Sequence, residues 1–105
     1  KINKMAKVLR TFEKGDEPST NGTSLKGYLN LTYDQLVDRL GEPTIDEPSG
    51  DNKTQVEWVV AYGDDIFTIY DWKTYDKEYT INALGRFNVG GISYAGDFIS
   101  YLESL

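Results

Sequence analysis

The chain of 105 residues contains no cysteine and no histidine. Without cysteine the chain has no disulfide bond, no thiolate nucleophile and no zinc–sulfur site. Without histidine it has no imidazole-based triad or dyad, and it lacks the commonest metal ligand. The sequence also has no apolar run as long as a membrane-spanning helix, so we expect a soluble protein that does not bind membranes.

Acidic residues outnumber basic residues by 17 to 11, which gives a net charge of −6. The excess is concentrated in residues 42–71, which contain eight acidic residues and one lysine, whereas residues 1–14 are basic. An acidic segment of this kind repels nucleic acid and membrane phosphates and attracts basic surfaces. The alternative is that acidic loops only keep a small protein in solution.

The segment 31–43, LTYDQLVDRLGEP, has the signals of a short helix. Thr32 is the expected N-cap, and Gln35 follows at the spacing of a capping box. Gly41 and Pro43 supply the stop. A helix this short is marginal by itself, so its apolar stripe must pack against the rest of the protein. That stripe has the spacing i, i+3, i+4, i+7 and consists of Tyr33, Leu36, Val37 and Leu40.

Residues 55–62 and 66–73 are rich in β-branched and aromatic residues and are predicted strands. The short Gly-Asp-Asp sequence between them predicts a tight turn and therefore a β-hairpin. The second of these strands is apolar on both faces, as expected for a central strand or for one that presents aromatic residues to a partner. A third strand is expected around residues 84–89, ended by two glycines at 90–91.

The remaining segments complete a predicted α+β fold. Residues 1–24 are interpreted as an N-terminal strand or arm with an exposed loop, and residues 25–105 as one compact domain. Residues 25–31 are expected to lead into the first helix, and 74–79 to form a polar turn. The last segment predicts a helix with Ser93 as N-cap. The prediction is an antiparallel sheet of three to four strands with two helices packed on one face.

Asp71 is the acidic residue most closely surrounded by aromatic residues, since it stands between Tyr70 and Trp72. Desolvation at such a position can raise the pKa of a carboxyl group, and general acids use this effect. An enzymatic interpretation therefore places Asp71 with Tyr70 and Lys73 in a pocket. We favour the alternative that Asp71 lies on an exposed face beside Lys73 and that no residue is catalytic.

Metal and cofactor motifs are incomplete. Residues 46–57 offer oxygen ligands but lack the alternating acids and fixed glycine of a calcium loop. Residues 88–93, NVGGIS, are expected to open the last helix, where an anion could bind, but no P-loop pattern completes the motif. We therefore predict neither a metal nor a cofactor.

Several short motifs occur in order along residues 32–91: TYDQLV, LGEP, EW, TIYDWK and GG. In this pattern the chain resembles a group of small, mostly uncharacterised acidic bacteriophage proteins. A typical member of that group has tryptophan where this chain has Phe87. The resemblance implies a setting in the host cytoplasm rather than a reaction, because small acidic phage proteins without catalytic residues often occlude a host protein. Anti-CRISPR proteins, anti-restriction proteins and DNA mimics are examples.

The leading hypothesis is therefore a non-enzymatic inhibitor that binds a host defence or nucleic-acid enzyme with a basic surface, in one version by DNA mimicry. No direct nucleic-acid contact is expected, and self-association stays open. The alternatives are a virion structural or assembly protein, or a module that sequesters a small nucleotide by the glycines at 90–91 and Arg86. The residues expected to contact the host protein are Glu47, Asp51, Asp64, Asp65, Tyr70, Asp71 and Trp72.

Overall fold

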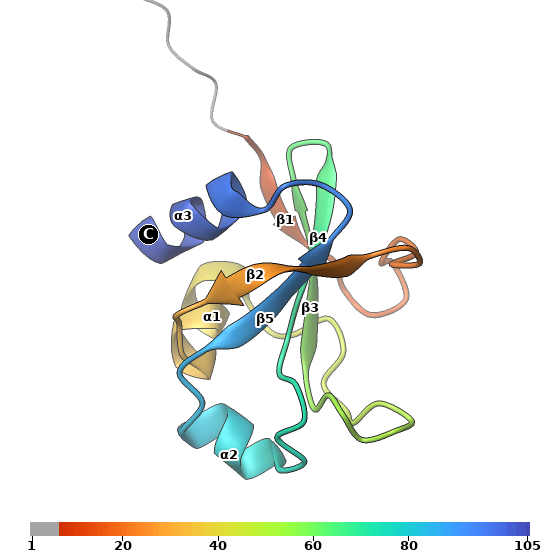
Figure 1. The fold of residues 1–105 in the computed structure, drawn as a ribbon, viewed down its shortest axis with the longest axis vertical. Coiled ribbons are helices and arrows are strands. Elements are labelled where there is room, and N and C mark those ends of the chain that lie inside the picture. The colour runs from red at the N-terminus through yellow and green to blue at the C-terminus, as the bar shows by residue number, and fades with distance from the viewer. Residues whose placement is uncertain (1–6) are drawn as a thin grey trace, which may run out of the picture.

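The computed structural model describes residues 7–105, and residues 1–6 of the predicted N-terminal arm lie outside the described residues. The fold is α+β, as predicted (Figure 1). The described residues form one antiparallel sheet of five strands, in the order β1-β3-β4-β5-β2, and three helices. The sheet is thus larger than the three to four strands predicted, and one more helix is present than expected.

The elements follow one another with short connections, apart from two longer loops at residues 12–23 and 41–56. The strands are β1 (Leu9–Thr11), β2 (Ser24–Leu29), β3 (Glu57–Tyr62), β4 (Asp65–Tyr70) and β5 (Phe87–Gly91). The helices are α1 (Tyr33–Leu40), α2 (Lys77–Asn82) and α3 (Gly96–Ser104).

Helix α1 is confirmed with its predicted caps. The Thr32 side chain accepts a hydrogen bond from the Gln35 N–H at 3.2 Å, and the Gln35 side chain accepts one from the Thr32 N–H at 2.9 Å. Gly41 ends the helix with a φ of +84°, a conformation that glycine adopts without steric cost. On the buried side, the ring centroid of Tyr33 lies 5.6 Å from that of Trp58, which is how the helix braces the sheet.

The predicted β-hairpin is also confirmed. Strands β3 and β4 pair from Glu57 opposite Tyr70 to Tyr62 opposite Asp65, and the chain reverses at residues 63–64. Both strands are shorter than predicted at the end far from this turn. There the Asp71 side chain, rather than a strand partner, accepts the hydrogen bonds of the backbone N–H groups at residues 55 and 56.

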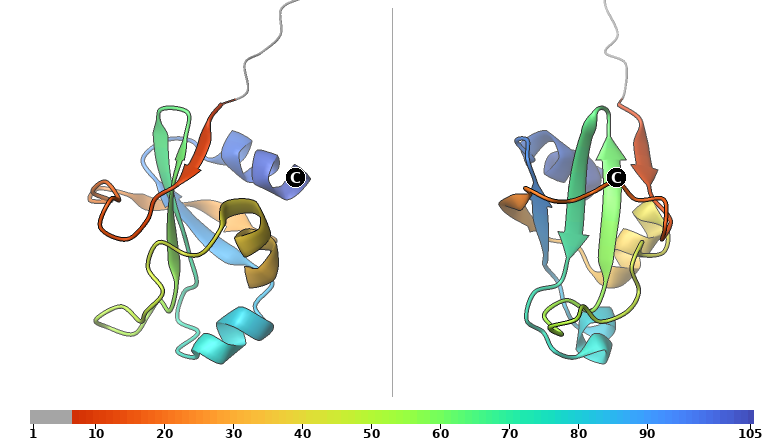
Figure 2. Two further views of the ribbon diagram at one scale, coloured as in Figure 1. Left: turned by 180° about the vertical axis from the view of Figure 1, so that it is seen from behind. Right: turned by 90° about the vertical axis from the view of Figure 1, so that its right-hand side faces the viewer.

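All three helices lie on one side of the sheet, and the loops at 12–23 and 46–54 lie on the other (Figure 2, left). The core forms on the helix side, where the Phe67 and Phe98 rings stack with centroids 4.4 Å apart. The prediction that helices cover a single face is therefore confirmed. The sheet residues with the largest fully buried side chains on this side are Leu29, Trp58, Val60, Phe67, Ile69, Phe87 and Val89.

Two predictions about strands were wrong. Residues 25–31 are mostly strand β2, whose pattern is irregular because the register with β5 shifts between Leu25 and Gly27. The third strand is present as β5, but it begins at Phe87 rather than Leu84, and the two glycines at 90–91 are its last residues rather than a turn that follows it. They are needed for close packing: a Cβ at Gly90 would lie 2.8 Å from Thr68 Oγ1, and one at Gly91 would lie 2.8 Å from Phe67 Cδ1.

Two predictions about helices were also wrong. The polar segment expected to be a turn leads into α2, where the Asp76 carboxylate accepts hydrogen bonds from the backbone N–H groups of Glu78 and Tyr79. Helix α3 begins at Gly96 with Ala95 as its N-cap. Ser93, the expected cap, instead donates a hydrogen bond of 3.0 Å to the Asp65 carboxylate.

Candidate functional site

Asp71 is buried, with 1% of its surface exposed, so the prediction that it lies on an exposed face beside Lys73 was wrong. One carboxylate oxygen accepts hydrogen bonds from the N–H groups of Gln55 (2.7 Å) and Val56 (3.1 Å). The other accepts hydrogen bonds from the hydroxyls of Thr74 (2.7 Å) and Thr80 (2.8 Å). Each oxygen thus has two donors, as a buried carboxylate requires.

These four bonds tie together segments that are distant in sequence. Gln55 and Val56 precede β3, Thr74 follows β4, and Thr80 belongs to α2. Asp71 therefore fixes the loop before β3, the end of β4 and α2 as one unit. Buried in this arrangement, Asp71 acts as a structural anchor.

The chain immediately after Asp71 has an unusual backbone conformation. Lys73 and Tyr75 both have a φ of +57°, in the left-handed region that non-glycine residues rarely adopt. The Lys73 N–H donates a hydrogen bond of 2.7 Å to the Lys53 carbonyl, which holds the segment in place. Backbone strain of this kind persists only where surrounding contacts impose it, and it concentrates at functional sites.

This segment displays aromatic side chains around a hollow of about 550 Å³. Trp72 is 47% exposed and Tyr79 is 49% exposed, which is unusual for rings of this size. Tyr75, which lies in the sequence between the lining residues Thr74 and Asp76, is also exposed. The residues that line the hollow are Trp72, Lys73, Thr74, Asp76, Tyr79 and Leu84.

Further aromatic side chains extend from Trp72 across the sheet face that no helix covers. The rings of Tyr70 and Trp72 meet edge to face, with centroids 6.1 Å apart. Tyr70 on β4 and Tyr28 on β2 both lie opposite Asn88 on the strand between them, so the two tyrosines are about 10 Å apart on one face. Sequence analysis included Tyr70 and Trp72 but missed Tyr28 and Tyr79, since β2 and α2 were not predicted.

Three basic side chains lie on these rings. The ammonium groups of Lys53 and Lys73 are 5.8 and 5.7 Å from the centroid of Trp72, and the Arg86 guanidinium is 4.3 Å from the centroid of Tyr28. Such contacts are favourable because the face of an aromatic ring is electron-rich. We call the whole set the Trp72 surface; it consists of Tyr28, Lys53, Tyr70, Trp72, Lys73, Tyr79 and Arg86.

The acidic residues of the segment 42–71 do not form one continuous surface. Figure 1 places the β3–β4 turn, with Asp64 and Asp65, at one end of the molecule and the loop with Glu47 and Asp51 toward the other. Strands of six residues separate these ends by about 20 Å.

Basic side chains also accompany the acids of the 46–51 loop. Lys14 binds Glu47 at 2.9 Å, and Lys77 binds Asp46 at 2.8 Å. Asp51 accepts a 2.7 Å hydrogen bond from the Ser49 hydroxyl, which lowers the pKa of the Asp51 carboxyl below its ordinary value. These carboxylates are exposed but already have local partners.

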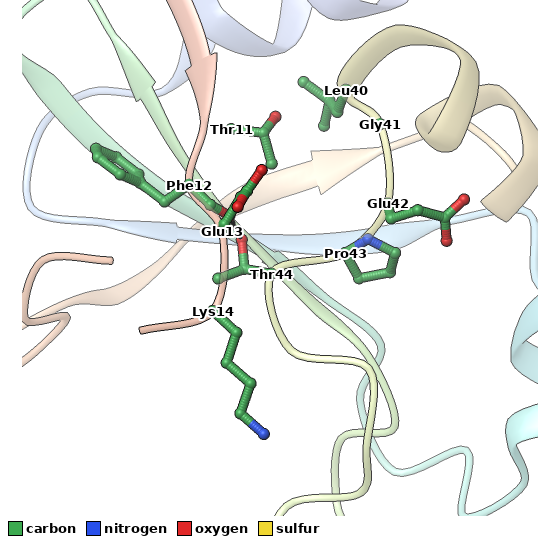
Figure 3. Close-up of a pocket in the computed structure, with 9 residues that line it drawn as sticks. All are labelled: Thr11, Phe12, Glu13, Lys14, Leu40, Gly41, Glu42, Pro43 and Thr44. Atoms are coloured by element: carbon green, nitrogen blue, oxygen red, sulfur yellow. Dashed lines mark hydrogen bonds between the residues drawn. The ribbon is translucent and has the colours of Figure 1, made fainter. Parts of the chain in front are cut away.

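A second hollow, of about 460 Å³, lies between the end of β1 and the segment after α1 (Figure 3). Thr44 joins its two walls: its hydroxyl donates a 2.6 Å hydrogen bond to the Phe12 carbonyl and accepts one from the Val59 N–H at 2.9 Å. Glu13 and Glu42 line the hollow, whereas the Lys14 side chain extends away from it. Across residues 7–105, no group of three or more Asp and Glu residues is arranged to hold a metal ion.

Glu57 is the partly buried acid of the helix-free sheet face. Burial is the main cause that raises the pKa of its carboxyl above the ordinary value of 4.5, and the nearby Glu17 carboxylate adds to the effect. Glu17 belongs to the loop 12–23, so this loop and β3 place two like charges near each other.

Comparisons with known proteins give no match: no family model, no curated protein and no solved structure is significantly similar to the chain. None of the helices in residues 7–105 is long and apolar enough to cross a membrane. The functional argument therefore depends on the surface of this molecule alone.

Proposed function

We propose that this protein is a non-catalytic binding module that occludes a host protein through the Trp72 surface. The resemblance to small acidic bacteriophage proteins supports a host protein as the target and the host cytoplasm as the compartment. The observation on which the proposal depends is Trp72 itself, a large ring that is half exposed beside a hollow and on a rigid support.

Protein interfaces concentrate their binding energy in a few Trp, Tyr and Arg residues that enter or line pockets. The Trp72 surface has this composition, with Trp72 at the hollow and Tyr70, Tyr28 and Arg86 beside it. Its rigidity also favours binding, because a contact that is already held in place loses little conformational entropy when the partner arrives. The four hydrogen bonds of Asp71 supply this rigidity.

Binding accounts for the surface better than catalysis does. The enzymatic interpretation required Asp71 in a pocket with Tyr70 and Lys73, but Asp71 is buried and each of its oxygens already accepts two hydrogen bonds. A general acid or base must reach a substrate proton, directly or through one water.

The DNA-mimicry version of the hypothesis needs closely spaced carboxylates on one surface. The pair Asp64 and Asp65 is separated from Glu47 and Asp51 by the length of the hairpin, and Glu47 is paired with a lysine. Occlusion through aromatic contacts needs no such continuity, and it is the version proposed.

Affinity capture from host lysate with wild type and variants tests the proposal. We expect Trp72→Ala to reduce capture of the host protein by at least about thirtyfold, the minimum effect of losing an interface hot spot. Tyr94→Ala is the matched control, because Tyr94 is 80% exposed and adjoins Ser93, which binds the hairpin-turn residue Asp65 at the other end. The proposal is wrong if Trp72→Ala captures the same protein as well as the control does.

A further inference from the structure

We propose that the segment bound at the Trp72 surface is acidic: a stretch of polypeptide with carboxylates on both sides of an apolar side chain. This inference rests on the proposed function, and it specifies the chemistry of the partner. The net charge of −6 suggests a basic partner, but charge complementarity acts through the charges at the contact itself.

The charges at the contact are positive. Lys53 and Lys73 flank the Trp72 ring, and Arg86 lies on the other side of the same sheet face. Lys73 and Arg86 form no ion pair within residues 7–105, and Lys53 meets Asp51 only at 4.0 Å. The described molecule therefore leaves these cations available for anionic groups from outside.

Three carboxylates beside the hollow or next to Lys53 and Lys73 are already engaged, whereas Glu57, opposite Tyr70 on the same sheet face, is not one of them. Asp71 is buried with four hydrogen-bond donors, and Asp76 accepts the two N–H groups that begin α2. Asp51 accepts hydrogen bonds from Ser49 and from the Lys53 N–H. These three carboxylates therefore compete little with a partner carboxylate for Lys73 or Arg86.

The hollow explains why an apolar side chain should lie between those carboxylates. Trp72, Tyr79 and Leu84 form its apolar walls, and Lys73 stands at its border. An aliphatic or aromatic side chain placed there would cover rings that now face water, which is the main favourable term in association. Carboxylates on the neighbouring residues would then reach the flanking cations.

Single-stranded nucleic acid could also stack on aromatic rings beside basic residues. Single-stranded nucleic acid fits this molecule less well, because its affinity depends on neutralising many phosphates, and within residues 7–105 three cations lie on the rings of the Trp72 surface while the chain has a net charge of −6. A short peptide with two or three carboxylates is repelled less by the rest of the molecule. We therefore infer a protein segment.

Selection of a random peptide library on the folded full chain tests the inference. We expect selected peptides to be rich in Asp and Glu around Leu, Met, Phe or Trp. Enrichment of basic or uncharged peptides, or no enrichment, would overturn the inference. So would tighter binding of an oligo-dT probe than of the best acidic peptide, measured in the same buffer.

Charge reversal makes the test specific to the site. The double variant Lys53→Glu with Lys73→Glu should weaken the best acidic peptide by at least about tenfold, with a loss that shrinks as salt is added. The control Lys7→Glu with Arg10→Glu changes the net charge equally, but Arg10 lies in β1, at one edge of the sheet, and Lys7 lies just before that strand. Equal effects of the two double variants would refute the inference.

The proposed function and this inference can fail separately. Loss of the host protein by Trp72→Ala, together with unchanged capture by the Lys53→Glu, Lys73→Glu variant, would keep the protein-binding function and refute the acidic partner. Unchanged capture by Trp72→Ala would refute the function itself. Circular dichroism of every variant verifies that the fold is intact, so that a lost contact is not confused with unfolding.

Discussion

The substitution of Asp71 tests how the candidate site is built. In Asp71→Ala, the N–H groups of Gln55 and Val56 and the hydroxyls of Thr74 and Thr80 all lose their acceptor. A hydrogen bond to a charged group contributes about 1.5–3 kcal/mol, and a buried donor left without a partner costs about 1–3 kcal/mol. These contributions are not additive, because the two threonine hydroxyls lie 2.8 Å apart and can bond to each other.

We therefore expect Asp71→Ala to lower the free energy of unfolding by about 3–5 kcal/mol, a large part of the 5–15 kcal/mol typical of a domain. Asp71→Asn should cost less, about 1.5–3 kcal/mol. Its oxygen can still accept the two backbone N–H groups, but its amide group can only donate toward the threonine hydroxyls, which must then turn to accept.

Urea denaturation followed by tryptophan fluorescence and by circular dichroism measures both changes. Asp64→Asn is the control, since Asp64 is exposed in the hairpin turn, and it should stay within about 0.5 kcal/mol of wild type. If Asp71→Ala unfolds within about 1 kcal/mol of wild type, the carboxylate does not anchor the three segments and the argument for a rigid Trp72 surface fails.

Two further predictions concern the sheet. Gly90→Ala should destabilise the protein by about 1–3 kcal/mol in urea denaturation, because the added Cβ would lie 2.8 Å from Thr68 Oγ1. Gly50→Ala is the control and should have little effect, because a Cβ at Gly50 meets nothing within 4 Å. Equal effects of the two substitutions would contradict the packing argument. The raised pKa of Glu57 means that the folded protein binds a proton more tightly than the unfolded chain, so stability should fall as the pH rises from about 4.5 through the folded pKa. Glu57→Gln should weaken this fall in denaturation curves measured across pH, and an unchanged pH profile would show that Glu57 does not cause it.

The parts of the fold that were predicted correctly depend on neighbours in sequence. Helix α1 needs only Thr32, Gln35 and Gly41 within one short segment, and their hydrogen bonds form as expected. The hairpin of β3 and β4 follows from two apolar segments and the turn between them. The α+β class and the placement of helices on a single face follow from these elements, because each must bury its apolar side.

Most of the incorrect predictions involve partners that are distant in sequence; the missed helix α2 is the local exception. Strand β2 pairs with β5, about sixty residues later, so its pattern has no local explanation. Asp76 begins a helix that was predicted to be a turn, since the same residue type favours both. The glycines at 90–91 are the last residues of β5, but the sequence did not show that the Thr68 and Phe67 side chains require glycine there for space.

The candidate site shows the same division. The sequence pattern led to the prediction that Tyr70 and Trp72 are contact residues, and the composition gave the chain its net negative charge. The sequence by itself thus determined the local elements, the class of fold and the identity of two aromatic residues, because capping, turn formation and alternation act between near neighbours. The tertiary structure decided that Asp71 is buried, that the acidic residues are divided between two ends, and that Lys53, Lys73 and Arg86 lie on the aromatic rings. These features depend on which distant segments the sheet brings together, and strand pairing is fixed only when the whole chain folds.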